Sequence, residues 1–223
     1  MAGDFQKGIR LILIINVPAA AGLALLGRPI VRLIYMHGHV THDDASRMAL
    51  LLSIMVIGLP FFSVVNLMVR AFYAVKDTRT PVRVALVDFL VNITISLLFI
   101  HWLGVLGIVM ASTAAIIAQA FLLDRALVRR LPQMHLGPLA PSIAKVLAGT
   151  AVMAAVVAGG WRALQALGLG SRTADAAVVA ALIPAGIAAY GLTLWKLRIE
   201  GRKELEAMLS RVPVLGRLFR APL

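Results

Sequence analysis

Six apolar runs, each long enough to cross a lipid bilayer, dominate this sequence of 223 residues. A helix rises 1.5 Å per residue, so about 20 apolar residues span a hydrocarbon layer about 30 Å thick. The runs occupy residues 9–35, 48–73, 81–103, 105–127, 141–164 and 174–197. Hydrophobic residues make up 61% of the chain, well above the roughly 45–50% that is typical of soluble domains. The sequence therefore predicts an all-α, polytopic transmembrane protein.

Prolines and glycines interrupt two of these runs. The first contains Pro18 and the pair Arg28-Pro29, so we expect it to span the membrane to about Leu26 and then to continue as a helix. The second contains Gly58–Pro60, and a proline inside a helix removes one backbone hydrogen bond and crowds the preceding turn. A kink is therefore expected at that point.

Basic residues are distributed unevenly between the two sides that alternating spans create. Of the 22 lysines and arginines, 17 fall on the side shared by the N-terminus, the segments 70–83 and 124–145, and the C-terminal tail. The other side holds the remaining five: Arg28, Arg32, Arg47, Arg162 and Arg172. An excess of lysine and arginine marks the cytoplasmic side of a membrane protein. We therefore expect both termini in the cytoplasm, and the net charge of +12 requires no nucleic acid partner.

The connection between the second and third runs, RAFYAVKDTRTPVR, holds four basic residues around one short motif: Asp77, Thr78, Arg79, Thr80 and Pro81. The Thr80 hydroxyl can cap exposed helix amides and Pro81 suits a first turn, so a helix should begin here. Asp77 can cap the same helix or pair with Arg79. Arg70, at the inner end of the second run, either faces a cavity mouth or anchors the helix at the interface.

This segment, from Arg70 to Pro81, resembles the signature of the MviN/MurJ family, the bacterial lipid II flippases of the multidrug/oligosaccharidyl-lipid/polysaccharide exporter superfamily. Two further segments resemble the same family: the upstream PAAAGLALLGRPIVRLIY with its loop HGHVTHDDA, and the later LGVLGIVMASTAAIIAQAFLLDRAL. The resemblance covers about residues 3–135. Beyond Leu136 it rests on the number and spacing of the helices.

The resemblance implies fourteen transmembrane helices, with two six-helix lobes around a cavity and two further helices. The six runs would be helices nine to fourteen, so we expect the chain to be the C-terminal part of a longer protein. Residues 1–135 would form the second half of the C-terminal lobe, residues 136–198 the two additional helices, and residues 199–223 a cytoplasmic amphipathic tail. The implied location is the bacterial inner membrane. The implied partners are lipid II, membrane lipids and the N-terminal helices of the same protein.

A polar stripe follows the third apolar run. Asp88, Asn92 and Ser96 are four residues apart and therefore lie on one face of a helix. An intramembrane carboxylate is costly, so it should face the protein interior, a water-filled cavity, an ion or a basic partner. Two interpretations of Asp88 stay open: a role in transport, or local pairing with Arg79 or Arg83 near the cytoplasm.

The family resemblance also implies a cation site. Some members hold sodium with an Asn and an acidic residue four positions later, and with a carbonyl and a hydroxyl on the next helix. The matching positions are Asn92, Ser96, Ile108 and Ser112, and the neutral Ser96 departs from the pattern. Asp88, one turn earlier, would compensate. Sodium, protons or the membrane potential would then drive transport without any further cofactor. The alternative is that these side chains form interhelical hydrogen bonds: Asn92, Ser96, Ser112 and Thr113.

The connection after the first run gathers five potential metal ligands: His37, His39, His42, Asp43 and Asp44. Imidazoles and carboxylates can bind zinc, but the helical spacing of a catalytic zinc site is absent. We therefore expect solvated residues, with Thr41 or Asp43 capping the following helix.

Two arginines, Arg28 and Arg32, lie one turn apart near the same side of the membrane. They either meet the anionic headgroup of the substrate or extend to lipid phosphates. Together with Arg70 and Asp88, they are the residues that we consider for substrate or cavity contact.

The last two runs carry small residues at four-residue intervals: Ala151, Ala155 and Gly159 in one, and Ala177, Ala181, Ala185 and Ala189 in the other. Such stripes allow two helices to approach closely. The family resemblance implies that this helix pair flanks a lipophilic groove for a polyprenyl tail.

The function expected from these observations is a lipid II flippase that works by alternating access. Three alternatives stay open: a polysaccharide-precursor flippase or a cation-coupled drug exporter of the same superfamily, and a membrane scaffold that transports nothing. An enzyme would need a convergent nucleophile or metal constellation, and the histidine-containing loop is the sole candidate in the sequence.

Overall fold

The computed structural model describes residues 2–35, 41–131, 137–166 and 172–197, and every regular element within these ranges is a helix. The elements are α1 (Ala2–Tyr35), α2 (His42–Ile57), α3 (Leu59–Ala74), α4 (Arg79–Leu103), α5 (Val105–Arg130), η2 (Gly137–Leu139), α6 (Ala140–Ala166) and α7 (Arg172–Lys196). Six helical segments are long and apolar enough to cross a membrane, with α2 and α3 forming one of them. The predicted all-α, six-span architecture is therefore confirmed. The tail at residues 199–223 lies outside the described residues.

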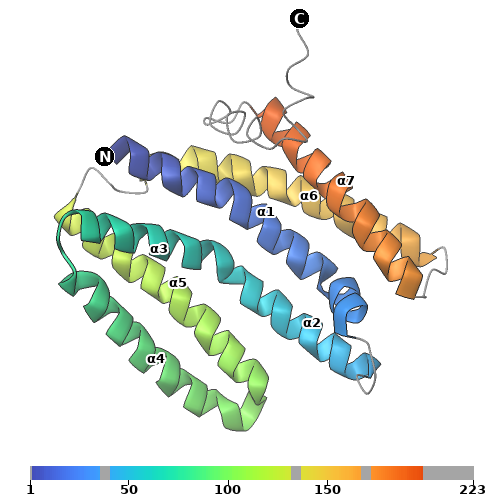
Figure 1. Ribbon diagram of the computed structural model, residues 1–223, viewed down its shortest axis with the longest axis horizontal. Coiled ribbons are helices and arrows are strands. Elements are labelled where there is room, and N and C mark those ends of the chain that lie inside the picture. The colour runs from blue at the N-terminus through green and yellow to red at the C-terminus, as the bar shows by residue number, and fades with distance from the viewer. Residues whose placement is uncertain (1, 36–40, 132–136, 167–171, 198–223) are drawn as a thin grey trace, which may run out of the picture.

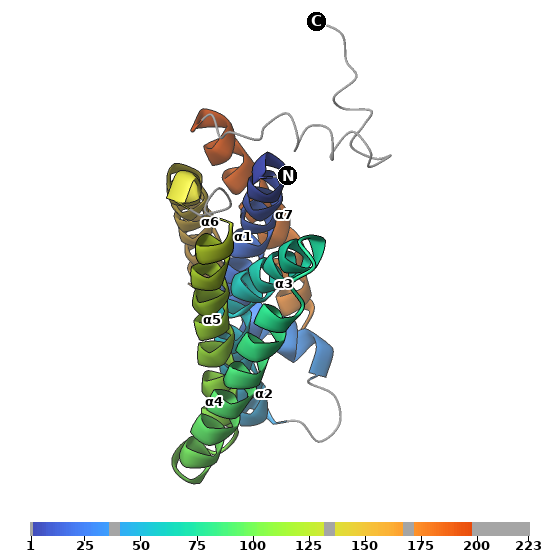
Figure 2. The same cartoon turned by 90° about the vertical axis from the view of Figure 1, so that its left-hand side faces the viewer.

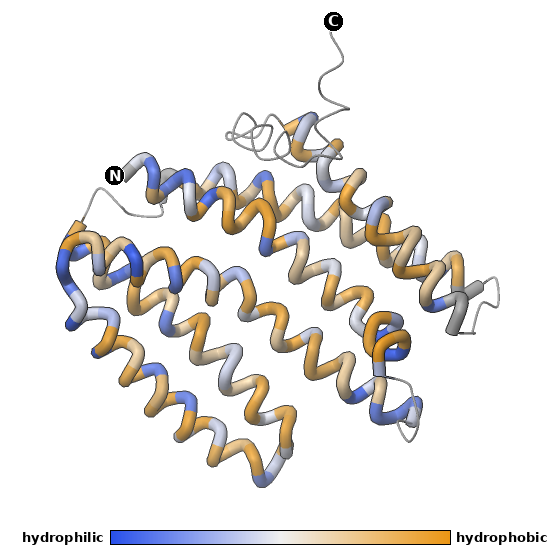
Figure 3. The backbone as a smooth tube through the Cα atoms, viewed as in Figure 1, coloured by the Kyte–Doolittle hydropathy of each residue, from blue (hydrophilic) through white to orange (hydrophobic). Residues whose placement is uncertain are grey.

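Helix α1 occupies the centre of the molecule, because α2, α3, α6 and α7 all pack against it. Helices α6 and α7 lie on one side of α1 and the other helices on the opposite side (Figure 1). Helix α4 packs mainly on α5, so it forms an edge of the bundle, as the view turned by 90° also shows (Figure 2). Orange, hydrophobic positions cover most of each helix, while blue positions concentrate near the helix ends (Figure 3).

The largest buried cluster joins α1, α3 and α5. Its most deeply buried side chains are Ile9 of α1, Met68 and Phe72 of α3, Leu123 and Leu127 of α5, and Leu139 of η2. Many apolar side chains on the outer faces are exposed instead, with Trp102 of α4 at 85%. A helix whose outer face is apolar suits a lipid environment, in which the hydrophobic effect does not drive helix association.

The expected kink in the second run is present. Helix α2 ends at Ile57 and α3 begins at Leu59, and the Gly58 amide donates to the carbonyl of Met55 at 3.1 Å. This tighter turn frees the carbonyl of Ile54, which accepts a hydrogen bond from the Thr113 hydroxyl of α5 at 3.3 Å. Backbone groups within a bilayer need such internal partners. Helix α1, in contrast, continues through both of its prolines to Tyr35, as the predicted extension required.

A sharp turn at Gly104 joins α4 to α5. Its φ of +57° lies in the left-handed region, where a side chain is strained. Glycine therefore permits the two helices to fold back on each other as an antiparallel pair.

The contact between α6 and α7 corrects one prediction. Ala151, Ala155 and Gly159 are exposed rather than packed, as are Ala177, Ala181 and Ala185. The buried seam lies on neighbouring faces and contains Met153 and Val157 of α6 and Leu182 of α7. Both helices are rich in small residues, so several stripes with a four-residue spacing coexist, and spacing by itself did not identify the packed one.

Candidate functional site

Asp77 organises the connection between α3 and α4. Its Oδ1 accepts a hydrogen bond from the Thr80 amide at 3.1 Å, and its Oδ2 accepts one from the Thr80 hydroxyl at 2.7 Å. Asp77 therefore caps the start of α4, which was one of its two predicted roles. The prediction for Thr80 was wrong, because Thr80 lies inside α4 and its hydroxyl donates to Asp77, with no amide bonded to that hydroxyl among the described residues. Pro81 is buried in the first turn, as predicted.

Asp77 also reaches the end of α5. Its Oδ2 lies 3.7 Å from Nη2 of Arg130, so in the described part of the chain it pairs with Arg130 rather than with Arg79. The side-chain and backbone hydrogen bonds from Thr80, with a smaller contribution from Arg130, hold the pKa of Asp77 below its ordinary value. The charged carboxylate thus joins the turn, the start of α4 and the end of α5.

Three of the four residues matched to a cation site converge between α4 and α5. Asn92 Oδ1 accepts hydrogen bonds from Ser96 Oγ at 3.1 Å and from Ser112 Oγ of α5 at 3.5 Å. Ile108 lies one turn before Ser112, and its side chain is exposed. The bond from Ser112 is an interhelical hydrogen bond of the kind considered above, whereas the bond from Ser96 lies within α4. The arrangement also gathers three oxygen atoms of the hard type that sodium prefers.

Asp88 lies one turn before Asn92 and is partly buried. Its Oδ1 atom is buried and has no hydrogen-bond partner among the described residues. Within those residues, no ion pair joins Asp88 to Arg79 or Arg83. A buried carboxylate oxygen without a donor is costly in a membrane-spanning helix. Helix packing therefore accounts for Asp88 less well than for the other two residues of the polar stripe.

The arginines considered for headgroup contact lie in different surroundings. Arg28 of α1 and Arg70 of α3 are exposed. Arg32 pairs across helices, with its Nε 3.3 Å from Oδ2 of Asp175 in the first turn of α7. The side chain of Asp175 is 7% exposed and that of Arg32 is 29% exposed. Our sequence reasoning missed Asp175, although an acidic residue at the start of an apolar run was a signal that could have found it.

An apolar groove of about 470 Å³ lies between α1, α6 and α7. The residues that form its wall include Ile14, Pro18, Leu26 and Ile30 of α1, Met153 and Val157 of α6, and Leu182, Gly186, Ile187 and Tyr190 of α7. From Ile14 to Ile30 the helix rises about 24 Å, close to the thickness of the hydrocarbon layer. A groove beside the last two runs was expected from the family resemblance. Sequence reasoning did not predict that α1 would form its third wall.

One hydrogen bond explains how α1 tolerates Pro18 in this groove. Pro18 has no backbone amide hydrogen, so the carbonyl of Ile14, four residues earlier, lacks its intrahelical donor. The Tyr190 hydroxyl of α7 donates to that carbonyl at 2.8 Å. The bond satisfies the freed carbonyl and fixes α7 against α1 at one end of the groove. Sequence reasoning missed Tyr190, because its role depends on a proline in a distant helix.

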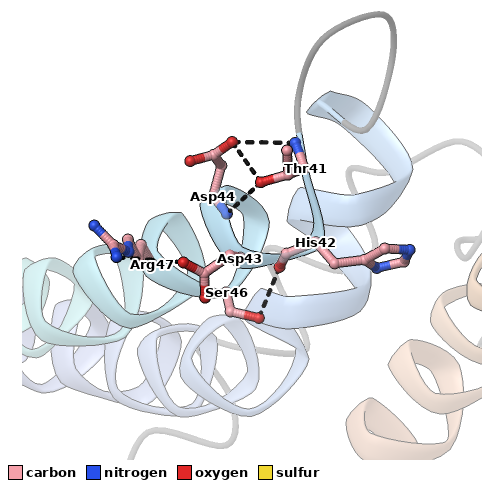
Figure 4. A network of polar contacts seen from close by, with 6 residues as sticks. All are labelled: Thr41, His42, Asp43, Asp44, Ser46 and Arg47. Atoms are coloured by element: carbon pink, nitrogen blue, oxygen red, sulfur yellow. Dashed lines mark hydrogen bonds and ion pairs between the residues drawn. The ribbon is translucent and has the colours of Figure 1, made fainter.

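The start of α2 uses its polar residues for structure (Figure 4). Thr41 and Asp44 form a reciprocal capping box, as predicted for Thr41. Asp43 pairs with Arg47 at 3.3 Å, and the His42 ring points away from both carboxylates (Figure 4). No group of three potential metal ligands occurs among the described residues. His37 and His39 lie outside those residues.

Comparisons with known proteins identify the relatives of this chain. Residues 1–176 match the family model described as lipid II flippase MurJ. The chain is 31% identical over 190 residues to the probable lipid II flippase MurJ of Rhizobium meliloti (strain 1021), which covers 83% of this chain and 35% of that protein. It is 33% identical over 119 residues to the lipid II flippase MurJ of Thermosipho africanus (strain TCF52B). That alignment covers 53% of this chain and 25% of the Thermosipho protein.

A solved structure shares the fold. The chain superposes on the lipid II flippase MurJ in its inward closed conformation with a TM-score of 0.68 and 22% sequence identity, covering 85% of this chain and 37% of that chain. The chain spans about a third of the length of this structure and of the Rhizobium protein. A flippase is a transporter rather than an enzyme, and the match extends over most of the sequence, including the signature loop and the two walls of the groove that α1 and α6 form. The chain belongs to the lipid II flippase MurJ family.

Proposed function

We propose that this chain forms part of a flippase that moves lipid II from the cytoplasmic to the periplasmic leaflet of the bacterial inner membrane. The observation that carries the proposal is the family match over residues 1–176, which includes α1 and α6 beside the groove. The groove is apolar and about as long as the hydrocarbon layer is thick. It would hold the polyprenyl tail while the headgroup crosses elsewhere in the protein.

The break between α2 and α3 is the proposed hinge for alternating access. Hinges absorb a change of backbone angle at a few residues, and the turn at Gly58 already departs from helical hydrogen bonding. Because the chain spans about a third of its relatives, the proposed partner for this motion is the remaining set of helices that those relatives contain.

The proposed coupling source is a cation or the membrane potential. Asn92, Ser96 and Ser112 would supply oxygen ligands to sodium, and Ile108 would add its carbonyl. Asp88, one turn away, would supply the negative charge that Ser96 lacks. Protons are the alternative, because a partly buried carboxylate can also carry one.

We propose that both termini lie in the cytoplasm, on the basis of the arginine and lysine distribution. Reporter fusions at His39 and Arg79 test this topology. The fusion at His39 is expected to report the periplasm and the fusion at Arg79 the cytoplasm. The same compartment for both would contradict the topology.

Lipid II exposure in cells tests the transport function. The chain is expressed in a bacterium depleted of its own flippase, either alone or joined to the first eight helices of the Rhizobium protein. We expect the joined protein to restore the access of a periplasmic probe to lipid II. Restored access to a different lipid-linked sugar, with lipid II still hidden, would favour a polysaccharide-precursor flippase. No transport by a joined protein that is correctly folded would favour the scaffold.

A further inference from the structure

Two donors compete for the carbonyl of Ile54 at the break between α2 and α3. In a regular helix this carbonyl accepts a hydrogen bond from the amide four residues later, which belongs to Gly58. In the structure the Gly58 amide donates to the Met55 carbonyl at 3.1 Å, and the Thr113 hydroxyl of α5 donates to the Ile54 carbonyl at 3.3 Å. The break therefore replaces a donor within the helix by a donor from another helix.

The backbone at Gly58 is close to a helical conformation. Its φ of −71° and ψ of −19° are near the values of a 3₁₀ turn, and an α-helix differs from these mainly by a small change in ψ. Pro60 favours the break because it lacks an amide hydrogen, but it leaves the Gly58 donor intact. The segment thus has two arrangements in which the Ile54 carbonyl is paired: a break held by Thr113, and a continuous helix closed by Gly58.

The position of α5 decides between these arrangements. Thr113 and the preceding Ser112 lie about 100° apart on the helix, because it has 3.6 residues per turn. Thr113 is buried against α2, whereas Ser112 is exposed and its hydroxyl donates to Asn92 of α4 at 3.5 Å. Both bonds are longer than the usual O–H···O distance of about 2.7–2.8 Å. A rotation of α5 that shortens one of them therefore lengthens the other.

We infer that Thr113 is a positioning residue that maintains the break between α2 and α3, and that Ser112 links this break to the polar stripe of α4 through α5. When the Thr113 hydroxyl withdraws, the Gly58 amide takes over the Ile54 carbonyl and the two helices join. The carbonyl passes between donors because an unpaired backbone group is costly within a bilayer. The inference rests on the proposed hinge, since it names the groups that set the hinge.

The amide resonance of Gly58 tests this exchange of donors. Ile57 and Gly58 form the only Ile-Gly pair in the sequence, so a chain with ¹³C-carbonyl isoleucine and ¹⁵N-glycine selects this one amide. For Thr113→Val in lipid nanodiscs, we expect the resonance to move and its exchange with deuterium to slow about threefold. That factor corresponds to an average hydrogen bond between membrane helices.

The direction of the change separates the inference from a purely structural role. If Thr113 only supports the break, its loss loosens the segment and the Gly58 amide exchanges faster. Faster exchange, or an unchanged resonance, would overturn the inference. Thr113→Ser retains the hydroxyl and is expected to restore both the resonance and the exchange rate of the original chain.

Thr150→Val is the matched control. Thr150 of α6 and Thr113 are both 8% exposed, but the Thr150 hydroxyl donates to the Val146 carbonyl of its own helix at 2.8 Å. The substitution removes the same hydroxyl at the same degree of burial and should leave the Gly58 signal unchanged. A response as large as that of Thr113→Val would mean that the loss of any buried hydroxyl is sufficient, and the inference would fail.

Ser112→Ala tests the link to α4. Without the bond to Asn92, α5 is free to rotate toward α2, so we expect the Gly58 resonance to move in the direction opposite to that of Thr113→Val. Ser112→Ala combined with Thr113→Val should match Thr113→Val alone, because Ser112 acts through Thr113. No shift for Ser112→Ala, or a double variant that shows the sum of both effects, would disprove the link.

Lipid II exposure distinguishes this inference from the proposed function. In the joined flippase, Thr113→Val is expected to lower the access of the periplasmic probe, whereas Thr150→Val is not. Slower exchange at Gly58 with unchanged lipid II exposure would contradict the role of the hinge in transport only. Reduced exposure with no change at Gly58 would contradict the inference only.

Discussion

The groove region formed by α1, α6 and α7 and the hairpin formed by α4 and α5 treat their polar groups differently. In the groove region, polar side chains connect separate helices: the Tyr190 hydroxyl donates to the Ile14 carbonyl, and Arg32 forms an ion pair with Asp175, although its Nε makes no hydrogen bond among the described residues. In the hairpin, Asn92 accepts hydrogen bonds from two serine hydroxyls, while the neighbouring Asp88 has a buried oxygen with no donor among the residues that the structure describes. The first region uses its polar groups to hold helices together. The hairpin contains a polar group, Asp88, that helix packing does not require.

This difference separates residues that the fold needs from residues that the function would need. A buried polar group that is fully paired contributes to a unique arrangement of helices, and its removal leaves the partner unpaired. A buried carboxylate without a partner costs stability wherever it stands. Mutations in the groove region should therefore lower stability, whereas the mutation of Asp88 should not.

The largest effect is expected for Asp175→Ala, which leaves Arg32 without its counter-charge. Removing one partner of a buried ion pair costs roughly 3 kcal/mol or more, and we expect a loss of about 3 kcal/mol because Arg32 is partly exposed. The free energy of unfolding in mixed micelles, titrated with a denaturing detergent, measures the loss.

The exposed ion pair of α2 is the control for that measurement. Asp43 and Arg47 have side chains that are 77% and 78% exposed, and such pairs within one helix contribute about 0.3–0.5 kcal/mol. Asp43→Ala should therefore change the free energy of unfolding by no more than this amount. Similar losses for Asp43→Ala and Asp175→Ala would show that burial does not distinguish the two regions.

A smaller loss is expected for Tyr190→Phe, which removes the donor to the Ile14 carbonyl. Hydrogen bonds between membrane helices contribute about 0.6 kcal/mol on average and up to about 1.7 kcal/mol. We expect about 1 kcal/mol, because no intrahelical amide can replace the lost donor. Unfolding in mixed micelles again measures the change.

Pro18→Ala supplies the control through a double-mutant cycle. Alanine restores an amide hydrogen that can reach the Ile14 carbonyl, so Tyr190→Phe should cost less in that background than in the original chain. Equal costs in both backgrounds would mean that the tyrosine does not compensate for the proline.

The turn between α3 and α4, which contains Asp77, should make the free energy of unfolding depend on pH in the acidic range. Because hydrogen bonds from Thr80 lower the pKa of Asp77, the unfolded chain takes up a proton at Asp77 more readily than the folded chain. The contribution of Asp77 is therefore complete above the ordinary pKa of about 4 and is lost as the pH falls through the lower folded value. Unfolding measured from pH 6 downward should show this loss, and Asp77→Asn should reduce the slope. Thr80→Val should give an intermediate slope, since the backbone hydrogen bond persists.

The sequence predicted the parts of this fold that depend on local patterns. The length of the apolar runs predicted the six spans, Gly58–Pro60 predicted the break between α2 and α3, and Thr41 predicted the capping of α2. It did not predict contacts between helices that are distant in the chain, because they depend on how α1 and α7 are placed together. Tyr190 and Asp175 belong to that class. The packed seam of α6 and α7 was missed for a related reason, since small residues occupy several faces of both helices.

The smallest effect on stability is expected for Asp88→Asn, and this result would be the most informative about the hairpin. Asparagine has nearly the same shape as aspartate and carries no charge, and the buried Oδ1 of Asp88 makes no hydrogen bond within the described chain. We therefore expect the free energy of unfolding to change by less than about 0.5 kcal/mol. Asn92→Ala, which removes the acceptor of two hydroxyls, should cost about 1 kcal/mol.

If Asp88 carries the proposed coupling charge, the same Asp88→Asn change in the joined flippase should lower lipid II exposure although stability is unchanged. A loss of stability larger than that of Asn92→Ala would instead mean that Asp88 has a structural partner, and the distinction between the two regions would fail.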